Sequence, residues 1–249
     1  MSDVLTTWYL PEVDSSIAED ENEADCLWLV SERAVVRFDL TKGEYSPIVG
    51  IPLSTGFRTN DGKVSPCGRY WFGSMLTSPE LKKGQIFSIG KDKDVRVEAS
   101  GIAIPNTFCW MPDGSVLISD SMEQRCRRFM IKSDTQTIKC ALDFINLSDT
   151  SGTPDGGALD VNGNVWIAIW GASKVVCFSP NGEQLYELNL PAPQPSSCCF
   201  GGPDNDMLFV TTAKQGLSLE QLQQYPDSGK IFVIRLKVKG APLYRFKAE

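Results

Sequence analysis

Short apolar runs separated by turns dominate this chain. The runs are rich in Val, Ile, Trp and Phe, and the segments between them are rich in Gly, Asp and Asn. Runs of this kind are typical of β-strands, because β-branched and aromatic side chains pack well on a pleated sheet, whereas Gly and Asn adopt the backbone of tight turns. Only residues 217–224 have a helical pattern. The pattern therefore predicts an all-β protein.

One unit recurs along the chain: a turn, an apolar strand that follows it, and then a second strand. The turns lie about 42 to 49 residues apart, and a repeat of this length with four strands is typical of a β-propeller blade. We therefore expect a single propeller domain over residues 1–249, with five recognisable blades. The turn units occur at residues 21–30, 65–73, 111–120, 161–168 and 202–210. The second strands are expected at residues 34–40, 85–89, 127–131, 174–179 and 230–236.

Polar residues precede these units at four places. The innermost strands of a propeller line a central channel, and the loops that enter them form a shallow cup at one end. We therefore expect these four segments to converge there. They are residues 58–62, Pro105-Asn106, residues 154–156 and Ser196-Ser197. The Trp residues within the units, at positions 71, 110 and 166, are expected to pack between blades.

Charge and composition exclude several classes of function. The formal charge is -7, whereas a protein that binds nucleic acid needs a basic face. No apolar stretch is long enough to span a membrane, and the N-terminus lacks a signal pattern, so we expect a cytoplasmic protein. Its eight cysteines show no CxxC pair and are expected to be reduced thiols.

The chain contains no histidine. This absence excludes Ser-His-Asp and Cys-His catalysis as well as zinc held by imidazole. A metal would be held mainly by oxygen atoms, which favours hard cations such as calcium, magnesium or manganese. Proton transfer near neutral pH would fall first to a carboxylate.

Several segments, taken in order and at blade spacing, resemble the regucalcin, gluconolactonase and luciferin-regenerating enzyme family. The resemblance runs from about residue 57 to near the C-terminus. The segments that carry it are residues 58–75, 103–106, 153–156, 163–168, 197–202, 208–213 and 238–240.

The resemblance implies a six-bladed propeller that hydrolyses a small sugar lactone with one divalent cation. Calcium is the expected ion, with zinc, manganese and magnesium as alternatives. By motif, Asn106 and Asp155 stand at two metal-ligand positions, while Arg58 and Asn60 stand where the family contacts the lactone and metal-bound water. Asp155 would also act as the general base. The expected partner is therefore a small lactone, with neither nucleic acid nor a membrane.

The sequence departs from the family pattern in three places. The element that supplies the first metal ligand, a glutamate, is not intact, and Glu19 or Asp20 is expected to replace it. One blade is expected to be missing or fused, because only about 20 residues separate Phe38 from Arg58, where the resemblance implies a further blade. The Asn-Gly-Leu expected at the second ligand is Asn106-Thr-Phe.

Alternative interpretations stay open at this point. Residues 60–62 and 154–156 are also ordinary turn sequences, and Arg58 could form a salt bridge at the rim. A damaged first ligand position would favour a calcium-binding protein with little or no catalysis. A non-catalytic scaffold is a third hypothesis. Open blade edges could be covered by a second subunit.

Overall fold

The computed structural model describes residues 14–132 and 138–248, which form five antiparallel sheets. Four sheets have four strands and the fifth has three. The first two sheets contain β1 (Asp14–Glu19), β2 (Cys26–Ser31), β3 (Ala34–Asp39) and β4 (Glu44–Gly50), and then β5 (Phe57–Val64), β6 (Tyr70–Leu76), β7 (Gly84–Ile89) and β8 (Val95–Ile102). The third and fourth contain β9 (Pro105–Trp110), β10 (Val116–Asp120), β11 (Arg125–Ile131) and β12 (Ile138–Asn146), and then β13 (Thr153–Leu159), β14 (Val165–Trp170), β15 (Lys174–Phe178) and β16 (Gln184–Asn189). The fifth contains β17 (Pro195–Gly201), β18 (Met207–Thr212) and β19 (Ile231–Arg235).

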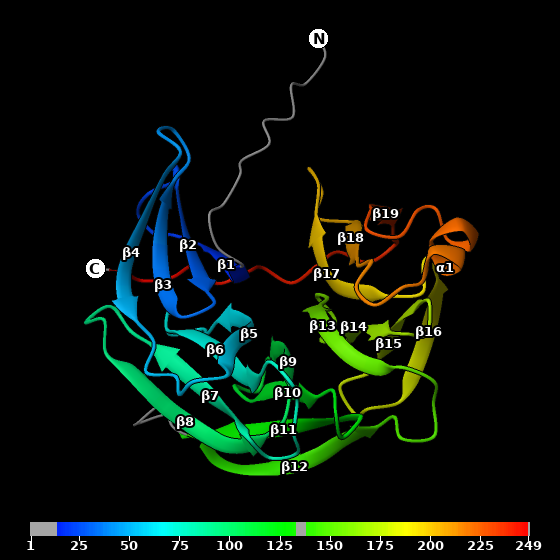
Figure 1. The fold of residues 1–249 in the computed structure, drawn as a ribbon, viewed down its shortest axis with the longest axis horizontal. Helices are drawn as coiled ribbons and strands as arrows, with labels where there is room; N and C mark the ends of the chain where they lie inside the picture. The colour runs from blue at the N-terminus through cyan, green and yellow to red at the C-terminus, as the bar shows by residue number, and fades with distance from the viewer. Residues whose placement is uncertain (1–13, 133–137, 249) are drawn as a thin grey trace.

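The sheets are propeller blades arranged around a common centre (Figure 1). In each blade the first strand is innermost, and these strands pack in the series β1, β5, β9, β13 and β17. Side chains between neighbouring blades form separate apolar clusters, in which Trp71, Trp110 and Trp166 are all buried. The all-β propeller and the packing role of these tryptophans are therefore confirmed.

The strand predicted after each turn unit forms close to the expected bounds, as β3, β7, β11, β15 and β19. The short helix and the turns also form where they were predicted. The helix is α1 (Leu219–Gln224), which begins with a Ser218 capping box and lies between β18 and β19. None of the helices in residues 14–132 and 138–248 is long and apolar enough to cross a membrane. All eight cysteines are free, and five of them are buried.

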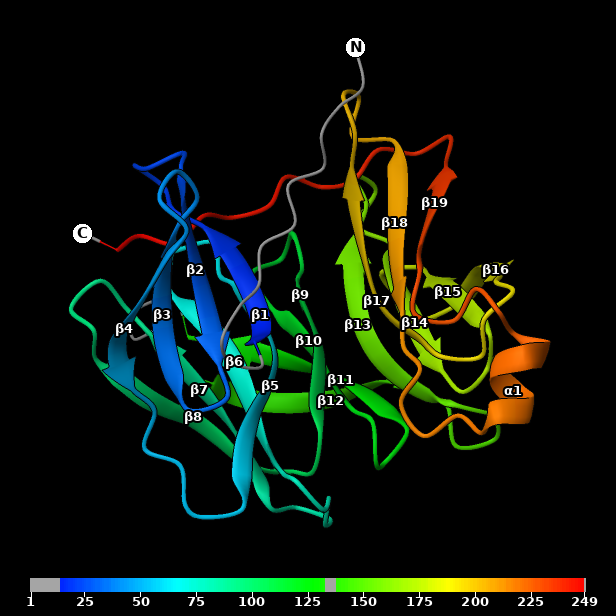
Figure 2. The ribbon, with the colours of Figure 1, turned by 45° about the horizontal axis from the view of Figure 1, so that its top comes forward.

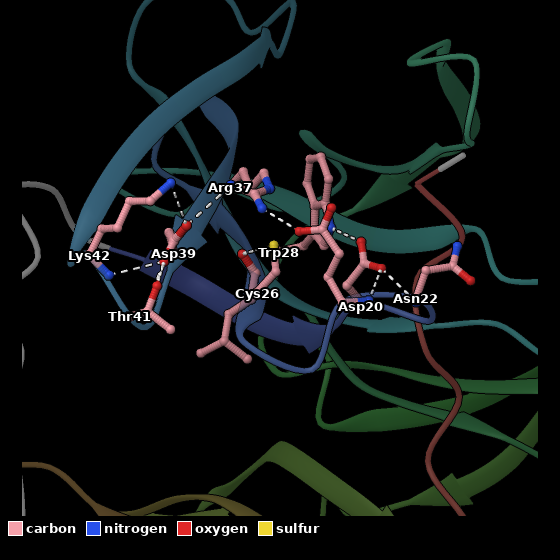
Figure 3. Close-up of polar contacts among 10 residues, drawn as sticks. Asp20, Asn22, Cys26, Trp28, Arg37, Asp39, Thr41 and Lys42 are labelled. Carbon is pink, nitrogen blue, oxygen red and sulfur yellow. Dashed lines mark hydrogen bonds and ion pairs between the residues drawn. The ribbon is translucent and has the colours of Figure 1, made fainter.

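An aspartate that precedes the second strand of a blade fixes the turn between the first two strands. In the first blade Asp20 accepts hydrogen bonds from the backbone of Asn22 and Glu23 and from Trp28 Nε1 at 2.6 Å (Figure 3). Asp160 makes the equivalent bond to Trp166 in the fourth blade, at 3.1 Å. Both carboxylates are buried. The turn units of the first and fourth blades are therefore anchored to the core by the same Asp–Trp contact.

The position of the missing blade differs from the prediction. The stretch between Phe38 and Arg58 contains β4, which completes the first blade and leaves no blade missing there. The ring is instead incomplete between the fifth and first blades, because the series of packed inner strands ends at β17 and comparable packing with β1 is not found among the described residues (Figure 2). Residues 14–132 and 138–248 therefore form five consecutive blades.

The C-terminal segment joins the two ends of this incomplete ring. It follows β19, pairs with the fourth blade at Gly240 and reaches the first blade at Phe246 (Figure 2). Phe246 is 2% exposed and packs edge-on against Trp28, with a centroid distance of 5.0 Å. Its backbone exchanges hydrogen bonds with Glu19 and Glu21. Residues 240–247 therefore connect the fourth blade with the first, which are not neighbours in the series of packed inner strands.

Candidate functional site

The predicted site residues lie at one end of three neighbouring inner strands. Arg58 and Asn60 lie in β5, Asn106 in β9 and Asp155 in β13. All four side chains line one cavity of about 890 Å³ at the centre of the propeller. The interpretation of Arg58 as a partner of a rim carboxylate finds no support, because its guanidinium donates to Thr59 O and Asn60 Oδ1 at 2.8 and 3.1 Å.

Each of these strands carries a β-bulge where its functional residue stands. The ladder shifts register between Thr59 and Gly62, at residues 106–109 and between Pro154 and Gly157. A bulge inserts an unpaired residue, bends the strand and turns side chains away from the regular alternation. Consecutive residues such as Asn60 and Asp61 can therefore both face the cavity.

Polar side chains join the three blades around the cavity. Asn60 Nδ2 donates to Pro105 O at 3.0 Å and to Asn106 Oδ1 at 3.2 Å. Asn106 Nδ2 donates to Ser121 Oγ at 2.7 Å, and Ser121 Oγ donates in turn to Pro154 O at 2.6 Å. Asn106, which is 4% exposed, is thereby oriented by partners on both sides. Its Oδ1 faces Asn60 and its Nδ2 faces Ser121, so that the amide orientation is fixed.

Asp155 is held in an environment that disfavours its charge. Burial raises the pKa of this carboxyl well above its ordinary value, and the neighbouring carboxyl of Asp61 raises it further. The backbone N–H of Gly156 and the guanidinium of Arg58 act in the opposite direction. The pKa stays raised although Arg58 provides some counter-charge, so a cation bound here would stabilise the ionised form of the carboxylate further.

The residue after Asn106 adopts a backbone conformation that side chains rarely take. Thr107 has φ of 81° and Phe108 has φ of 37°, in the left-handed region that favours glycine. Thr107 Oγ1 contacts Ser119 Oγ at 2.7 Å and donates to Asp155 O at 2.8 Å. These bonds stabilise the left-handed backbone of Thr107, which stands where the family pattern has glycine. They also connect β9 to the backbone of Asp155.

Two half-buried charged residues at the cavity were not among the predicted site residues, although Asp61 lies in the segment 58–62 that was expected at the cup. Asp61 lines the cavity, and its Oδ2 finds no hydrogen-bond partner in residues 14–132 and 138–248. Burial raises the pKa of this carboxyl. Lys63 lies deeper and donates to Gly157 O at 2.7 Å. Both belong to the segment 58–64, next to the predicted residues Arg58 and Asn60. Regular alternation along β5 would place Asp61 on the opposite face of the strand from Asn60, so its position in the cavity depends on the bulge.

Glu19 and Asp20 are not brought to this cavity. Both stand at the far end of the first inner strand, where Glu19 is exposed and pairs with Arg245 at 2.8 Å. Three residues of β-strand separate Glu19 from Ser16, which lines the cavity, and this spacing amounts to roughly 10 Å. Asp20 is engaged with its own turn and with Trp28. Neither carboxylate can join Asn106 and Asp155 in this arrangement.

The oxygen atoms at the cavity fit a hard cation better than a soft one. Asn106 supplies an amide oxygen, Asp155 a carboxylate and Asp61 a buried oxygen with no partner in the described chain. Carboxylate and amide oxygens are the donors that calcium and magnesium take, with water completing the shell. The described residues contain no cluster of three or more Asp, Glu, Cys or His side chains. The donor set therefore fits an ion that keeps several waters.

Sequence comparison relates this chain to lactonases and regucalcins. Residues 2–214 match the profile described as the SMP-30/Gluconolactonase/LRE-like region. A proposed sugar lactone lactonase of Rhizobium meliloti is 36% identical over 216 residues, which make up 85% of this chain and 72% of that protein. Regucalcin of Bos taurus is 34% identical over 197 residues, and the chain spans 66% of its length.

Comparison of structures gives the same relatives. A crystal structure of a calcium-binding protein, regucalcin, from Agrobacterium tumefaciens superposes with a TM-score of 0.89 at 28% identity. The superposition covers 97% of this chain and 82% of that one. Luciferin-regenerating enzyme superposes with a TM-score of 0.87 at 26% identity, over 96% of this chain and 83% of that one. The likeness extends over almost all of the present chain.

Proposed function

Because the chain belongs to the SMP-30/gluconolactonase/LRE-like family, we propose that it hydrolyses a small sugar lactone with one divalent cation. The observation that carries the proposal is the convergence of Asn106 and Asp155 on one cavity. The two residues come from different blades, and Ser121 links the Asn106 amide to the backbone beside Asp155. Oxygen donors of this kind suit calcium and magnesium, and calcium is the ion that the family resemblance implies.

Asn106 and Asp155 would hold the cation, with Asp61 close to it. When bound, a divalent ion polarises an ester carbonyl and lowers the pKa of water. It would also add to the counter-charge that Arg58 provides to the Asp155 carboxylate, whose pKa is raised by desolvation and by Asp61. This requirement for charge compensation supports a cation in the cavity independently of the family relationship.

Hydrolysis also needs groups that bind the lactone and move a proton. The Arg58 guanidinium lies in the cavity and is fixed by the β5 backbone, so it offers charge-assisted donors to substrate oxygens or to a developing oxyanion. Asn60 orients Asn106 and borders the same space. Asp155 would accept the proton of the attacking water, because no histidine is present for this task.

The experiment compares Asp155→Ala with the matched control Asp204→Ala, which removes an exposed turn carboxylate outside the cavity. Calorimetric titration with calcium and hydrolysis of D-glucono-1,5-lactone are measured for both variants. We expect Asp155→Ala to lose cation binding and turnover and the control to keep both. Turnover at the wild-type rate in metal-loaded Asp155→Ala would contradict the mechanism.

A second candidate function is cation binding with little or no catalysis. It is favoured by the position of Glu19, which leaves the cavity without the first glutamate ligand that the family resemblance implies. The same two measurements separate the candidates. Calcium binding by the wild-type protein without lactone turnover would favour the second, whereas both properties together would favour the first.

A further inference from the structure

One wall of the cavity has no part in the proposed chemistry. Arg58, Asn60, Asn106 and Asp155 belong to the second, third and fourth blades. The cavity extends beyond them to the end of β14 and to the strands of the fifth blade. Its volume of about 890 Å³ lies near the upper end of the range of roughly 300–1,000 Å³ that is typical of pockets for drug-sized ligands. A lactone of one hexose would leave much of this space empty.

An aromatic side chain stands at this wall. Trp170 is the last residue of β14 and pairs with Thr153 of β13, and both residues line the cavity. Alternation along β14 places it on the same face as Trp166, which packs against Phe200 of β17 with a centroid distance of 6.1 Å. Trp166 is buried in this way, whereas Trp170 is only half-buried and borders open space. Trp170 therefore presents apolar surface to the cavity.

Hydroxyl and amide groups face the same region from the fifth blade. Ser196 Oγ and Thr211 Oγ1 lie 2.8 Å apart, and both side chains line the cavity together with Gln215. Thr211 and Gln215 are exposed. Each hydroxyl can donate one hydrogen bond and accept two, and the Gln215 amide can do both. This set can therefore match further hydroxyls on a ligand that approaches from the mouth.

The two halves of the cavity are in direct contact. A Cβ atom added to Gly156 would lie 2.2 Å from Ser197 Oγ, so β17 approaches the fourth blade immediately beside Asp155. A ligand with its reacting ring at Asp155 would extend over this contact toward Ser196 and Trp170. A ligand could therefore occupy both halves of the cavity without a conformational change of the protein.

We propose that Trp170, Ser196, Thr211 and Gln215 form a second sugar subsite, so that the preferred substrate is the lactone of a disaccharide aldonic acid. The inference rests on the proposed function, whose residues would act on the first ring. An aromatic face packs against the apolar CH face of a sugar ring, while the hydroxyls and the amide bind its polar rim. Water adds to the lactone carbonyl carbon and gives a proton to Asp155, and the bond between that carbon and the ring oxygen breaks. The ring oxygen takes up the proton and becomes a hydroxyl, and the hydroxy acid that still carries the second sugar is released.

The first test compares kcat/KM for D-glucono-1,5-lactone and cellobiono-1,5-lactone. The variants are Trp170→Ala, Trp170→Phe, which keeps an aromatic face, and Ser196→Ala. The matched control is Tyr186→Ala, an exposed aromatic residue of the same blade outside the cavity. We expect Trp170→Ala to lower kcat/KM about tenfold for the disaccharide lactone and to leave the monosaccharide value unchanged. Trp170→Phe should retain most of the activity. Equal losses on both lactones would overturn the subsite.

The second test measures binding alone, which separates the subsite from the proposed reaction. Calorimetry compares cellobionate with gluconate on wild-type and Trp170→Ala protein. We expect cellobionate to bind more tightly to the wild type and the difference to vanish in the variant. If neither lactone is hydrolysed while this difference is present, the proposed function fails and the subsite stands. Equal affinities for the two acids in the wild type would overturn the subsite, even in an active lactonase.

Discussion

The side-chain amide of Asn60 donates to the side-chain oxygen of Asn106 at 3.2 Å and thereby connects the second and third blades. The same nitrogen also donates to Pro105 O. One amide group therefore fixes both the backbone and the side chain at the start of β9. The oxygen that is proposed to bind the cation owes its orientation to a residue 46 positions earlier in the chain.

Asn60→Asp is expected to disrupt this connection. The substitution replaces a donor with a carboxylate oxygen that would face two acceptors, Pro105 O and Asn106 Oδ1. A buried polar group that loses its partner costs about 1–3 kcal/mol. We expect a loss of stability of this order in urea unfolding. The matched control is Asn181→Asp in an exposed turn, which should change little. Equal effects of the two substitutions would show that the Asn60 amide contributes nothing specific.

Thr107→Val tests the hydroxyl that connects β9 with Asp155. Valine retains the shape of the side chain but leaves Ser119 Oγ and Asp155 O without the Thr107 hydroxyl, which contacts them at 2.7 and 2.8 Å. We expect a loss of about 1–3 kcal/mol in unfolding free energy and weaker calcium binding. Thr107→Ser, which keeps the hydroxyl, should be closer to the wild type. The idea is wrong if Val and Ser at this position behave alike.

The pH dependence of stability should report on Asp155. Burial raises the pKa of its carboxyl in the folded protein above the ordinary value of 3.8, so the folded state binds more protons than the unfolded chain between these two pKa values. The contribution of this group to stability is therefore fully present below pH 3.8 and is lost as pH rises through the folded pKa.

Asp155→Asn removes this dependence. In the presence of a chelator, the variant should match the wild type at the acid end of the series and become relatively more stable as pH rises toward neutrality. Urea midpoints measured across the pH series check this. A difference between the two proteins that does not change with pH would contradict the assignment.

Phe246→Ala tests the contact that joins the ends of the ring. The side chain is 2% exposed and packs between Trp28 and Tyr70. Removal of a buried phenylalanine costs about 3–5 kcal/mol. We expect a loss of this order in unfolding free energy and faster proteolysis of the C-terminal segment. Leu243→Ala, in the same segment but 63% exposed, should have a small effect. A loss in Phe246→Ala as small as the one in Leu243→Ala would mean that the Phe246 side chain contributes nothing to the closure of the ring.

The blades could be predicted because their signals are local. Each turn unit places Gly or Asp beside an apolar strand, and the second strands predicted at residues 34–40 and 174–179 form as β3 and β15. The meeting of Arg58, Asn60, Asn106 and Asp155 could also be predicted, since the starts of inner strands must converge at one end of a propeller.

The rest depends on long-range geometry that a sequence pattern does not contain. Glu19 was assigned by its proximity in sequence to a ligand motif, yet it stands at the opposite end of its strand from the cavity. Asp61 lies in the segment expected at the cup but was assigned no role, because a bulge that no local signal marked alters the alternation of β5 and turns its side chain to the cavity. Trp170 was missed because it lies just after the recognised turn unit, in a strand that continues to the cavity mouth.

The contact between Phe246 and Trp28 also has a consequence for biosynthesis. Its partners are separated by more than 200 positions in the chain, so it forms only after nearly all of the described chain has been made. The five blades can assemble in order as they leave the ribosome. Until residue 246 has also emerged, Trp28 of the first blade lacks the phenyl group of Phe246 that packs against it. A stalled or truncated nascent chain would thus expose an apolar patch on a nearly finished propeller, a surface that chaperones and proteases recognise.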